Sequence, residues 1–362
     1  MNFDLTEEQE MFRSSVERFA APIDVEARRK LRLSPTGYDR ERWTALADLG
    51  LITLAAPEDA GGMGGSVLDL ALVAEAIGKA NSPDPLLEHG VLPVILLTTG
   101  GQDGILEDVL SGAQVLSFAW AERAARYNLN ASNMKAESTA DGFSLSGEKT
   151  FVMGALLSDL FVVTADFDGE TSCFLVPKGA DGVEVRAYRL ADGSIAGELK
   201  LTRVRVGAAA KLNISPARLA DIVAEARLLA AAEMLGLGQR LLDDTVTYVK
   251  EREQFGVAIG SFQALQHRLV EAYAKIEQCR SMLYRAALTD ASYTEERHRA
   301  AAGAKAFIGE NVDAVAREAV QMHGGMGITD ELAIGHAMKR VMVLAKLFGD
   351  ASSALSEYAA AA

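Results

Sequence analysis

The pattern of hydrophobic residues changes twice along this 362-residue chain, and these two changes constrain its fold more than any other feature. In the first part, apolar residues recur at the three- and four-residue spacing of amphipathic helices, as at Phe12, Val16 and Phe19. In the middle they gather in short β-branched or aromatic runs, and the helical spacing then returns over longer stretches. We therefore predict an α+β protein with an N-terminal helical domain, a β domain and a C-terminal helical domain, at residues 1–112, 113–208 and 209–362.

The middle segment contains a repeated turn signal. Short apolar runs such as 160–163 and 172–176 are bounded by Asp-Gly pairs, which occur at 141–142, 168–169, 181–182 and 192–193. Because glycine adopts a positive φ at little cost, Asp-Gly between two such runs favours a tight hairpin turn. The segment is therefore expected to form a compact central antiparallel β domain.

Residues that start helices occur near both ends of the chain. Thr6 and Gln9 have the spacing of a capping box, and Ser215 followed by Pro216 provides an N-cap with proline at the first helical position. Long stretches of helical pattern follow and predict four C-terminal helices, which end or lie at about 251, 261–290, 294–322 and 331–347. Long consecutive helices with short links are typical of an antiparallel four-helix bundle.

Composition and charge exclude several classes of function. With 36 Lys and Arg against 50 Asp and Glu, the net charge of −14 disfavours nucleic acid and anionic lipid as partners. No apolar run approaches the roughly 20 residues of a membrane helix, and the acidic N-terminus does not resemble a targeting segment. Two cysteines without a disulfide framework fit a reducing cytoplasm. The five histidines lack the close spacing of metal ligands, so no metal is expected.

Two motifs in the C-terminal segment carry chemistry: REQFG at 252–256 and QMHGGMG at 321–327. The guanidinium of Arg252 is always charged and planar, which suits a pyrophosphate. Gly324 and Gly325 allow a ligand to approach the backbone closely. Each motif alone also fits a simpler interpretation, in which Arg252 is a solvated charge and the glycines end a helix. The glycines follow a helix and not a strand, so they are no dinucleotide fingerprint.

Taken together, the motifs resemble the acyl-CoA dehydrogenase family over nearly the whole chain. The two C-terminal motifs look like that family's FAD contacts. Three further segments match other parts of the family pattern: FDLTEEQ at 3–9, PEDAGGMG at 57–64 and GEKTFV at 147–152. The resemblance implies FAD as cofactor, an acyl-CoA thioester as substrate and an electron-transfer flavoprotein as electron acceptor. In such a reaction a carboxylate removes the α-proton and a hydride passes from the β-carbon to the flavin.

In the family, FAD lies at a subunit interface. One chain's β domain holds the flavin ring, and a neighbouring chain's bundle reaches the adenine-diphosphate half. The resemblance carries these donated contacts onto six positions of this sequence: Arg252, Phe255, Gln263, Gln321, Gly324 and Gly325.

The chain's own flavin seat, residues 119–126 and 147–154, departs from the family pattern. Ala121 stands where the family has a threonine that bonds the flavin, and a glycine-serine-aspartate run is absent. The flavin-facing strand has Phe151 and Met153 where the family has tryptophan and threonine. The resemblance therefore keeps Phe151 and Met153 as cofactor contacts, while two hydroxyl groups are missing.

The catalytic base departs as well. Most members carry a glutamate near the C-terminus, and Asp350 lies at or near that place in this chain. Other members carry the glutamate on the first bundle helix, where this chain has Ala226; Glu225 is one residue away and points about 100° around the helix.

Two readings of the function remain open. In the first, the chain is the FAD-completing subunit of a heteromeric enzyme, with a paralogous catalytic partner and a bulky acyl-CoA substrate such as a steroid side chain. In the second, it is an autonomous homo-oligomeric dehydrogenase with Asp350 as base. The first interpretation is favoured because the six donated contacts match the family pattern, whereas the flavin seat departs from it. Oxidases and monooxygenases of the same fold are a third, lesser alternative.

Overall fold

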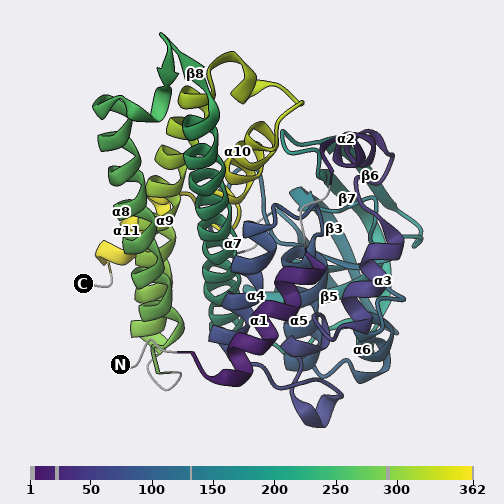
Figure 1. Ribbon diagram of the computed structural model, residues 1–362. Coiled ribbons are helices and arrows are strands. Elements are labelled where there is room, and N and C mark those ends of the chain that lie inside the picture. The colour runs from purple at the N-terminus through teal and green to yellow at the C-terminus, as the bar shows by residue number, and fades with distance from the viewer. Residues whose placement is uncertain (1–4, 21–23, 131–132, 291–293, 361–362) are drawn as a thin grey trace. The chain divides into compact units, whose positions relative to one another are not determined.

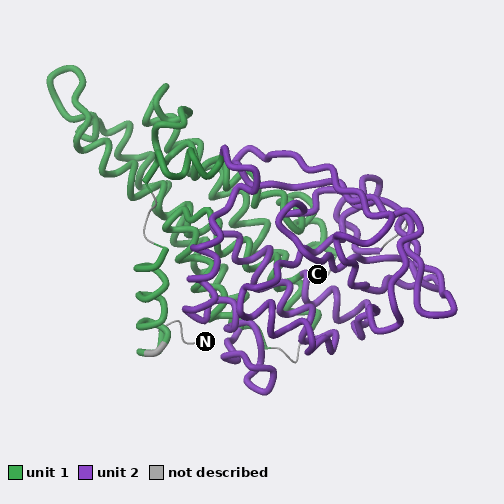
Figure 2. Tube along the Cα trace, turned by 90° about the vertical axis from the view of Figure 1, so that its right-hand side faces the viewer, with its two compact units in different colours: residues 1–32, 67–83, 224–362 green, residues 33–66, 84–223 purple. Residues whose placement is uncertain are grey.

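The computed structural model describes the whole chain except residues 1–4, 21–23, 131–132, 291–293 and 361–362. Its residues form two compact units, each assembled from separate parts of the sequence (Figure 2). One unit comprises residues 33–66 and 84–223, and the other comprises 1–32, 67–83 and 224–362. The predicted combination of helical segments with a central β region is confirmed. The three-domain division at residues 112 and 208 stays a prediction.

The first unit contains a seven-stranded sheet with the strand order β1-β4-β2-β3-β7-β6, and β5 pairs with β4. Most neighbours are antiparallel, as predicted, whereas β1 and β2 both run parallel to β4. Asp168 and Gly169 both have positive φ, 54° and 86°, so the Asp-Gly signal correctly located the hairpin turn between β4 and β5. The strands are β1 (Leu116–Ala119), β2 (Lys135–Thr139), β3 (Gly142–Met153), β4 (Leu160–Phe167), β5 (Glu170–Pro177), β6 (Val183–Arg189) and β7 (Ile195–Gly207).

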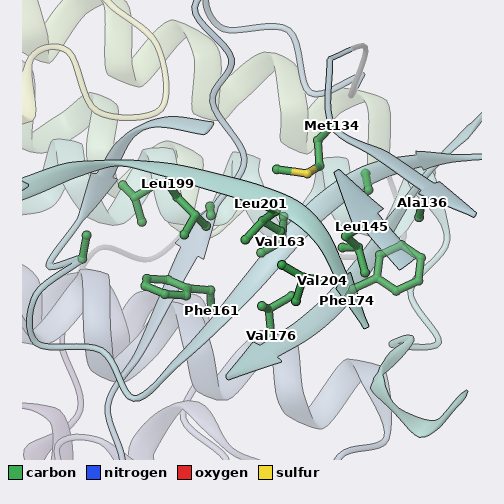
Figure 3. Close-up of a cluster of buried hydrophobic side chains, with 14 residues drawn as sticks. Met134, Ala136, Leu145, Phe161, Val163, Phe174, Val176, Leu199, Leu201 and Val204 are labelled. Carbon is green, nitrogen blue, oxygen red and sulfur yellow. The ribbon is translucent and has the colours of Figure 1, made fainter. Parts of the chain in front are cut away.

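The sheet has its own hydrophobic core, shown in Figure 3. Phe161, Phe174, Leu145 and Leu199 are fully buried in it. The ring of Phe174 also meets Phe143 edge to face, with 5.1 Å between centroids. This core holds the strands that carry the flavin seat.

Short helices complete this unit. Asp39 caps α3 by accepting from the backbone N–H groups of Glu41 and Arg42. The segment Leu86–Val91 forms a single π-helical turn, a rare geometry that is frequent at functional sites. The helices are α3 (Arg40–Asp48), η1 (Thr53–Ala55), η2 (Glu58–Ala60), η3 (Leu86–Val91), α5 (Leu92–Gly100), α6 (Asp103–Leu110) and η4 (Ala208–Ala210).

The second unit is helical (Figure 1). The predicted capping box is present at Thr6 and Gln9, and the four predicted C-terminal helices are found as α7 to α10. The elements are α1 (Glu7–Phe19), α2 (Val25–Leu33), α4 (Val67–Lys79), α7 (Pro216–Glu251), β8 (Glu253–Gln254), β9 (Val257–Ala258), η5 (Ile259–Ser261), α8 (Gln263–Ala287), α9 (Thr294–His323), η6 (Gly324–Ile328), α10 (Ala333–Leu344) and α11 (Ala351–Ala360).

Two helices of this unit were not predicted, α2 and α11. Both are short, with nine and ten residues. Tertiary contacts stabilise α11: Ala354 is buried, and the ring of Tyr358 packs so tightly on α9 that a Cβ on Gly303 would lie 2.9 Å from it. Packing against a neighbouring helix therefore decides a structure that local propensity leaves open.

Glycines let α4 and α7 touch. A Cβ on Gly236 would lie 2.0 Å from the carbonyl oxygen of Glu75, and one on Gly78 would lie 2.1 Å from that of Glu233. Only glycine fits at such a helix crossing. Among the described helices, none is long and apolar enough to cross a membrane.

Candidate functional site

Three helices of the bundle bring the two C-terminal motifs together at one end (Figure 1). The ring of Tyr248, near the end of α7, stacks on that of His323, the last residue of α9, with 4.2 Å between centroids. Near the start of α8, Arg268 Nη2 lies 2.5 Å from Glu318 Oε2 on α9. The structure therefore collects all six predicted donated contacts in one region, which we call the bundle end (residues 248–263 and 318–328).

A β-hairpin projects from this end between α7 and α8. Strands β8 and β9 pair across Phe255 and Gly256, whose φ values of 56° and 80° form a tight turn of the hairpin type. The ring of Phe255 is 91% exposed, and its edge contact with Phe262 covers little of it. A bulky residue at positive φ is strained, and an exposed aromatic ring does not help the chain to fold. The ring is thus placed for a contact outside this chain.

The polar groups of the bundle end are exposed. Within the described residues, the guanidinium of Arg252 has no hydrogen bond or ion pair. Gln263 and Gln321 are also exposed. A Cβ on Gly324 or Gly325 would meet no atom within 4 Å, so a ligand can reach the backbone there. A guanidinium, two amides and an open backbone are a donor set that fits the diphosphate half of FAD.

Apolar side chains surround these polar groups. Val257, Met326 and Ile328 are all exposed, Ile328 by 68%. Apolar residues gathered around a few polar groups are typical of a surface that another chain covers.

The segment predicted as the flavin seat has an irregular backbone. Strand β3 bulges between Lys149 and Val152, where Phe151 has a φ of 54°. The backbone N–H of Thr150 donates to the carbonyl of Ala121 at 2.9 Å, so the two parts of the seat lie side by side. Phe151 is half-buried and Met153 is buried. The structure thus brings the predicted residues together, but Ala121, Phe151 and Met153 offer no side-chain hydrogen-bond donor.

Buried hydroxyl groups and a histidine hold the end of this strand. Ser117 donates to the carbonyl of Met153 at 2.6 Å, and Ser158 donates to that of Gly154 at 3.1 Å. His89, from the π-helical turn, packs so close that a Cβ on Gly154 would lie 1.9 Å from its Nε2. Its Nδ1 lies 2.8 Å from the carbonyl oxygen of Leu116, so Nδ1 carries the proton. These contacts stabilise the backbone of the seat whether or not a flavin is bound.

A buried ion pair also supports the seat, and sequence analysis missed it. Lys149 Nζ lies 2.9 Å from Glu122 Oε1 and also donates to Thr164 at 2.8 Å. Glu122 accepts from the backbone N–H groups of Asn133 and Met134 at 2.8 and 3.1 Å. Burial acts to raise the pKa of Glu122, but the bond from Lys149 and the two N–H groups outweigh it and lower that pKa to about 2. Little in the sequence signals this pair, because Glu122 lies beyond the end of β1 and Lys149 on β3 is flanked by a glutamate and a threonine.

The structure places Asp350 at the start of α11 and away from the bundle end. Its Oδ1 accepts from the backbone N–H of Ser353 at 2.9 Å, and its Oδ2 lies 3.4 Å from Lys346 Nζ. The N–H of Ser353 contributes most to a lowered pKa of Asp350. The next residue, Ala351, packs on Gly309. That position lies one-half of the way along α9, roughly 20 Å from the end of the helix at 1.5 Å per residue.

Two buried cations hold the turn before Asp350, and both were missed from the sequence. Lys305 is fully buried on α9 and donates to the carbonyl of Leu344 at 2.5 Å. Arg227 Nε donates to the carbonyl of Phe348 at 2.9 Å. Burial lowers the pKa of Lys305 to about 7. Glu225, the other carboxylate considered from the sequence, is half-buried on α7 beside the buried Ala226.

Both cysteines are buried and free, and burial raises the pKa of each thiol to about 12. Neither is therefore a nucleophile near neutral pH. Within the described residues, no group of three or more His, Cys, Asp or Glu side chains could hold a metal ion.

Comparison with known proteins gives the same family over almost the whole chain. Three family models match: the acyl-CoA dehydrogenase N-terminal domain at residues 6–103, the middle domain at 117–204 and the C-terminal domain at 219–361. Among relatives, acyl-CoA dehydrogenase IpdE2 of Mycolicibacterium smegmatis is 33% identical over 95% of this chain and 96% of its own length.

Solved structures agree. The ChsE4–ChsE5 complex from Mycobacterium tuberculosis has a TM-score of 0.89 at 28% identity, covering 99% of this chain and 98% of that one. A variant of the Tcur3481–Tcur3483 steroid ACAD has a TM-score of 0.88 at 28% identity, covering 98% and 97%. PigA with FAD and proline has a TM-score of 0.91 at 26% identity, covering 99% and 98%. The chain therefore belongs to the acyl-CoA dehydrogenase family and is an FAD-dependent oxidoreductase.

Proposed function

We propose that this chain is the FAD-completing subunit of a heteromeric acyl-CoA dehydrogenase, whose partner is a paralogous chain that supplies the catalytic carboxylate. One contrast carries the proposal. The bundle end presents its polar groups outward, while the flavin seat has no side-chain donor at Ala121, Phe151 or Met153.

In this assembly the bundle end binds and orients. Arg252 would neutralise charge on the diphosphate, and Gln263 and Gln321 would donate hydrogen bonds from their amides. The backbone at Gly324 and Gly325 allows a close approach, and Phe255 packs against the partner. When bound, FAD supplies the hydride acceptor for α,β-dehydrogenation of the acyl thioester.

The electrostatics of Asp350 support a partner that supplies the base. Removing a proton from carbon near neutral pH favours a carboxylate whose pKa is raised toward that range. The pKa of Asp350 is lowered instead, because the N–H of Ser353 and the nearby Lys346 stabilise its charged form. The carboxylate already serves as the cap of α11.

The relatives support a two-chain enzyme with a lipid substrate. One structural neighbour is a complex of two named chains, ChsE4 and ChsE5, and another is described as a steroid ACAD. We infer an acyl-CoA with a bulky apolar acyl group as substrate, in lipid catabolism. An electron-transfer flavoprotein is inferred as acceptor. The free buried thiols support a cytoplasmic location.

One observation favours the alternative, an autonomous homo-oligomeric enzyme with Asp350 as base. Asp350 lines a hollow of about 780 Å³ bounded by α8, α9, α10 and α11, together with apolar residues such as Met342 and Leu355. A carboxylate beside an apolar hollow could meet an acyl chain.

The test is purification of the chain alone and together with a paralogue that carries the family glutamate, followed by visible spectra and native mass. We expect little flavin in the chain alone, and one FAD per pair of chains in the co-purified assembly. One FAD per chain in a homo-oligomer that acyl-CoA reduces would establish the alternative.

The Asp350→Asn variant then separates the two. Asparagine keeps an oxygen that can cap α11 but cannot act as a base. We expect the assembly to keep its turnover with this substitution. Loss of turnover with an unchanged melting temperature would make Asp350 the base.

A further inference from the structure

We infer that Tyr248 and His323 form a positioning pair for the donated FAD contacts, in which stacking of the two rings holds the ends of α7 and α9 in register. The inference rests on the proposed role of the bundle end. Neither residue is among the FAD contacts predicted at the bundle end or at the flavin seat.

The donated contacts come from three different helix ends. Arg252 follows α7, Gln263 begins α8, and Gln321 and Gly325 lie at the end of α9. Groups that bind one diphosphate must keep their mutual positions to about 0.5 Å. Contacts between the helix ends therefore decide whether the donor set is complete.

The ring stack joins two of these ends directly. The centroids of Tyr248 and His323 are 4.2 Å apart, and the ring planes are inclined by 23°. His323 is buried, and its Nδ1 lies 2.8 Å from the carbonyl oxygen of Ala319, which fixes the orientation of the imidazole. A ring held on one side by its own helix and on the other by a stacked phenol has little freedom to turn.

The backbone of each of these two residues is linked directly to a donated contact. The backbone N–H of Arg252 donates to the carbonyl of Tyr248 at 2.8 Å, so movement of Tyr248 moves Arg252. Gly324 follows His323 directly and has a φ of 63°, which turns the chain toward Gly325. The stack therefore sets the distance between the cation and the open backbone.

A second link at this end is weaker. Arg268 and Glu318 join α8 to α9, but both side chains are 38% exposed, and exposed ion pairs add little stability. The stack, with its buried imidazole, is thus the firmer of the two links.

The test measures FAD release from the assembled, FAD-loaded protein. Tyr248→Ala and His323→Ala remove a ring, and we expect each to speed FAD release by about tenfold. Tyr248→Phe and His323→Phe keep a stacked pair, and we expect release within about twofold of the parent. If the Phe variants release FAD as fast as the Ala variants, the hydroxyl or the imidazole contacts FAD itself and the positioning role is wrong.

A double substitution separates positioning from general loss of structure. If Tyr248 acts through Arg252, then Tyr248→Ala adds little to the effect of Arg252→Ala on FAD release. Additive effects, or Ala variants that release FAD at the parent rate, would overturn the inference. If Arg252→Ala itself leaves FAD release unchanged, the proposed function fails instead. Native mass and far-UV circular dichroism, measured on every variant, identify any that do not assemble.

Discussion

The bundle end and the flavin seat, the two regions that we propose to contact FAD, differ in what each offers to a ligand. The seat has the backbone: the bulge at Phe151, the buried hydroxyls of Ser117 and Ser158, and the ion pair of Glu122 with Lys149. The bundle end has the side chains: an exposed guanidinium and two exposed amides. Backbone scaffold and binding chemistry are therefore separable in this fold.

The physical reason lies in what each feature does for the chain itself. The hydroxyls and the ion pair of the seat are buried in the β domain, so they contribute to the stability of the chain itself. The hydroxyls of a flavin contact add nothing to the core of this domain. At the bundle end the relation is reversed, because exposed groups such as Phe255 do not stabilise this chain and matter only to a bound molecule.

The largest expected effect tests whether the seat is a stability element. Glu122→Gln leaves Lys149 buried without an anion, which typically lowers the free energy of unfolding by about 3–5 kcal/mol. Differential scanning calorimetry measures it. The matched control is Asp166→Asn, which breaks the exposed pair with Lys135 and should change stability by less than about 1 kcal/mol. If the two substitutions lower the free energy of unfolding equally, the buried pair of the seat is not a special stability element.

The same pair predicts acid sensitivity of the β domain. The pKa of Glu122 is about 2 in the folded chain, below its usual range of about 4.3. A lowered pKa means that the folded state binds fewer protons. Its stabilisation is therefore complete above about pH 4.3 and is lost as the pH falls toward 2. Glu122→Gln should flatten the plot of unfolding free energy against pH between about pH 2 and 4.3.

A further prediction concerns a buried lysine of the bundle. The pKa of Lys305 falls to about 7 on folding, so the unfolded chain binds more protons between about pH 7 and 10.5. The free energy of unfolding should rise over this interval, by up to about 5 kcal/mol from this group. Lys305→Met should remove that rise in chemical-denaturation curves, whereas Lys250→Met, at an exposed lysine of α7, should keep it. Parallel curves for the two variants would contradict the prediction.

Another prediction addresses the hydrogen-bond donors of the bundle end directly. Arg252→Ala removes a charge-assisted contact worth about 1.5–3 kcal/mol, so FAD should bind the assembly about 10- to 100-fold more weakly. Fluorescence titration of the apo-assembly with FAD measures the change. Arg285→Ala, an exposed arginine at the opposite end of α8, is the control and should bind FAD like the parent. The folded structure should be unaffected in both.

The smallest effect comes from restoring the seat. Ala121→Thr and Met153→Thr each return a hydroxyl, worth about 0.5–1.5 kcal/mol, or roughly two- to tenfold in FAD affinity. Ala121→Val and Met153→Val have nearly the same shape without the hydroxyl and should give no gain. If the threonine variants bind no better than the valine variants, missing hydroxyls do not explain the difference between the two regions.

Much of the fold follows from local sequence patterns. The capping box at Thr6, the hairpin turn at Asp168 and the starts of α7 and α9 each depend on a few neighbouring residues, so periodicity and turn chemistry located them. The short α2 and α11 helices were missed, and α11 depends on packing against α9. The parallel pairing of β1 with β4 was also missed, since strand order depends on long-range contacts.

The candidate site divides in the same way. Sequence alone determined which residue types are present: Arg252, the two glutamines and Gly324 with Gly325 on one side, and Ala121 with Met153 on the other. Residue identity sets what a group can donate, whatever its surroundings. Tertiary structure decided where these groups lie and in which charge state. It brought the ends of α7 and α9 together through Tyr248 and His323, used Asp350 as a helix cap, and buried Lys305 and the Glu122–Lys149 pair. Burial and distance arise only when segments far apart in sequence pack, and these two quantities set the pKa of a carboxylate and the geometry of a binding site.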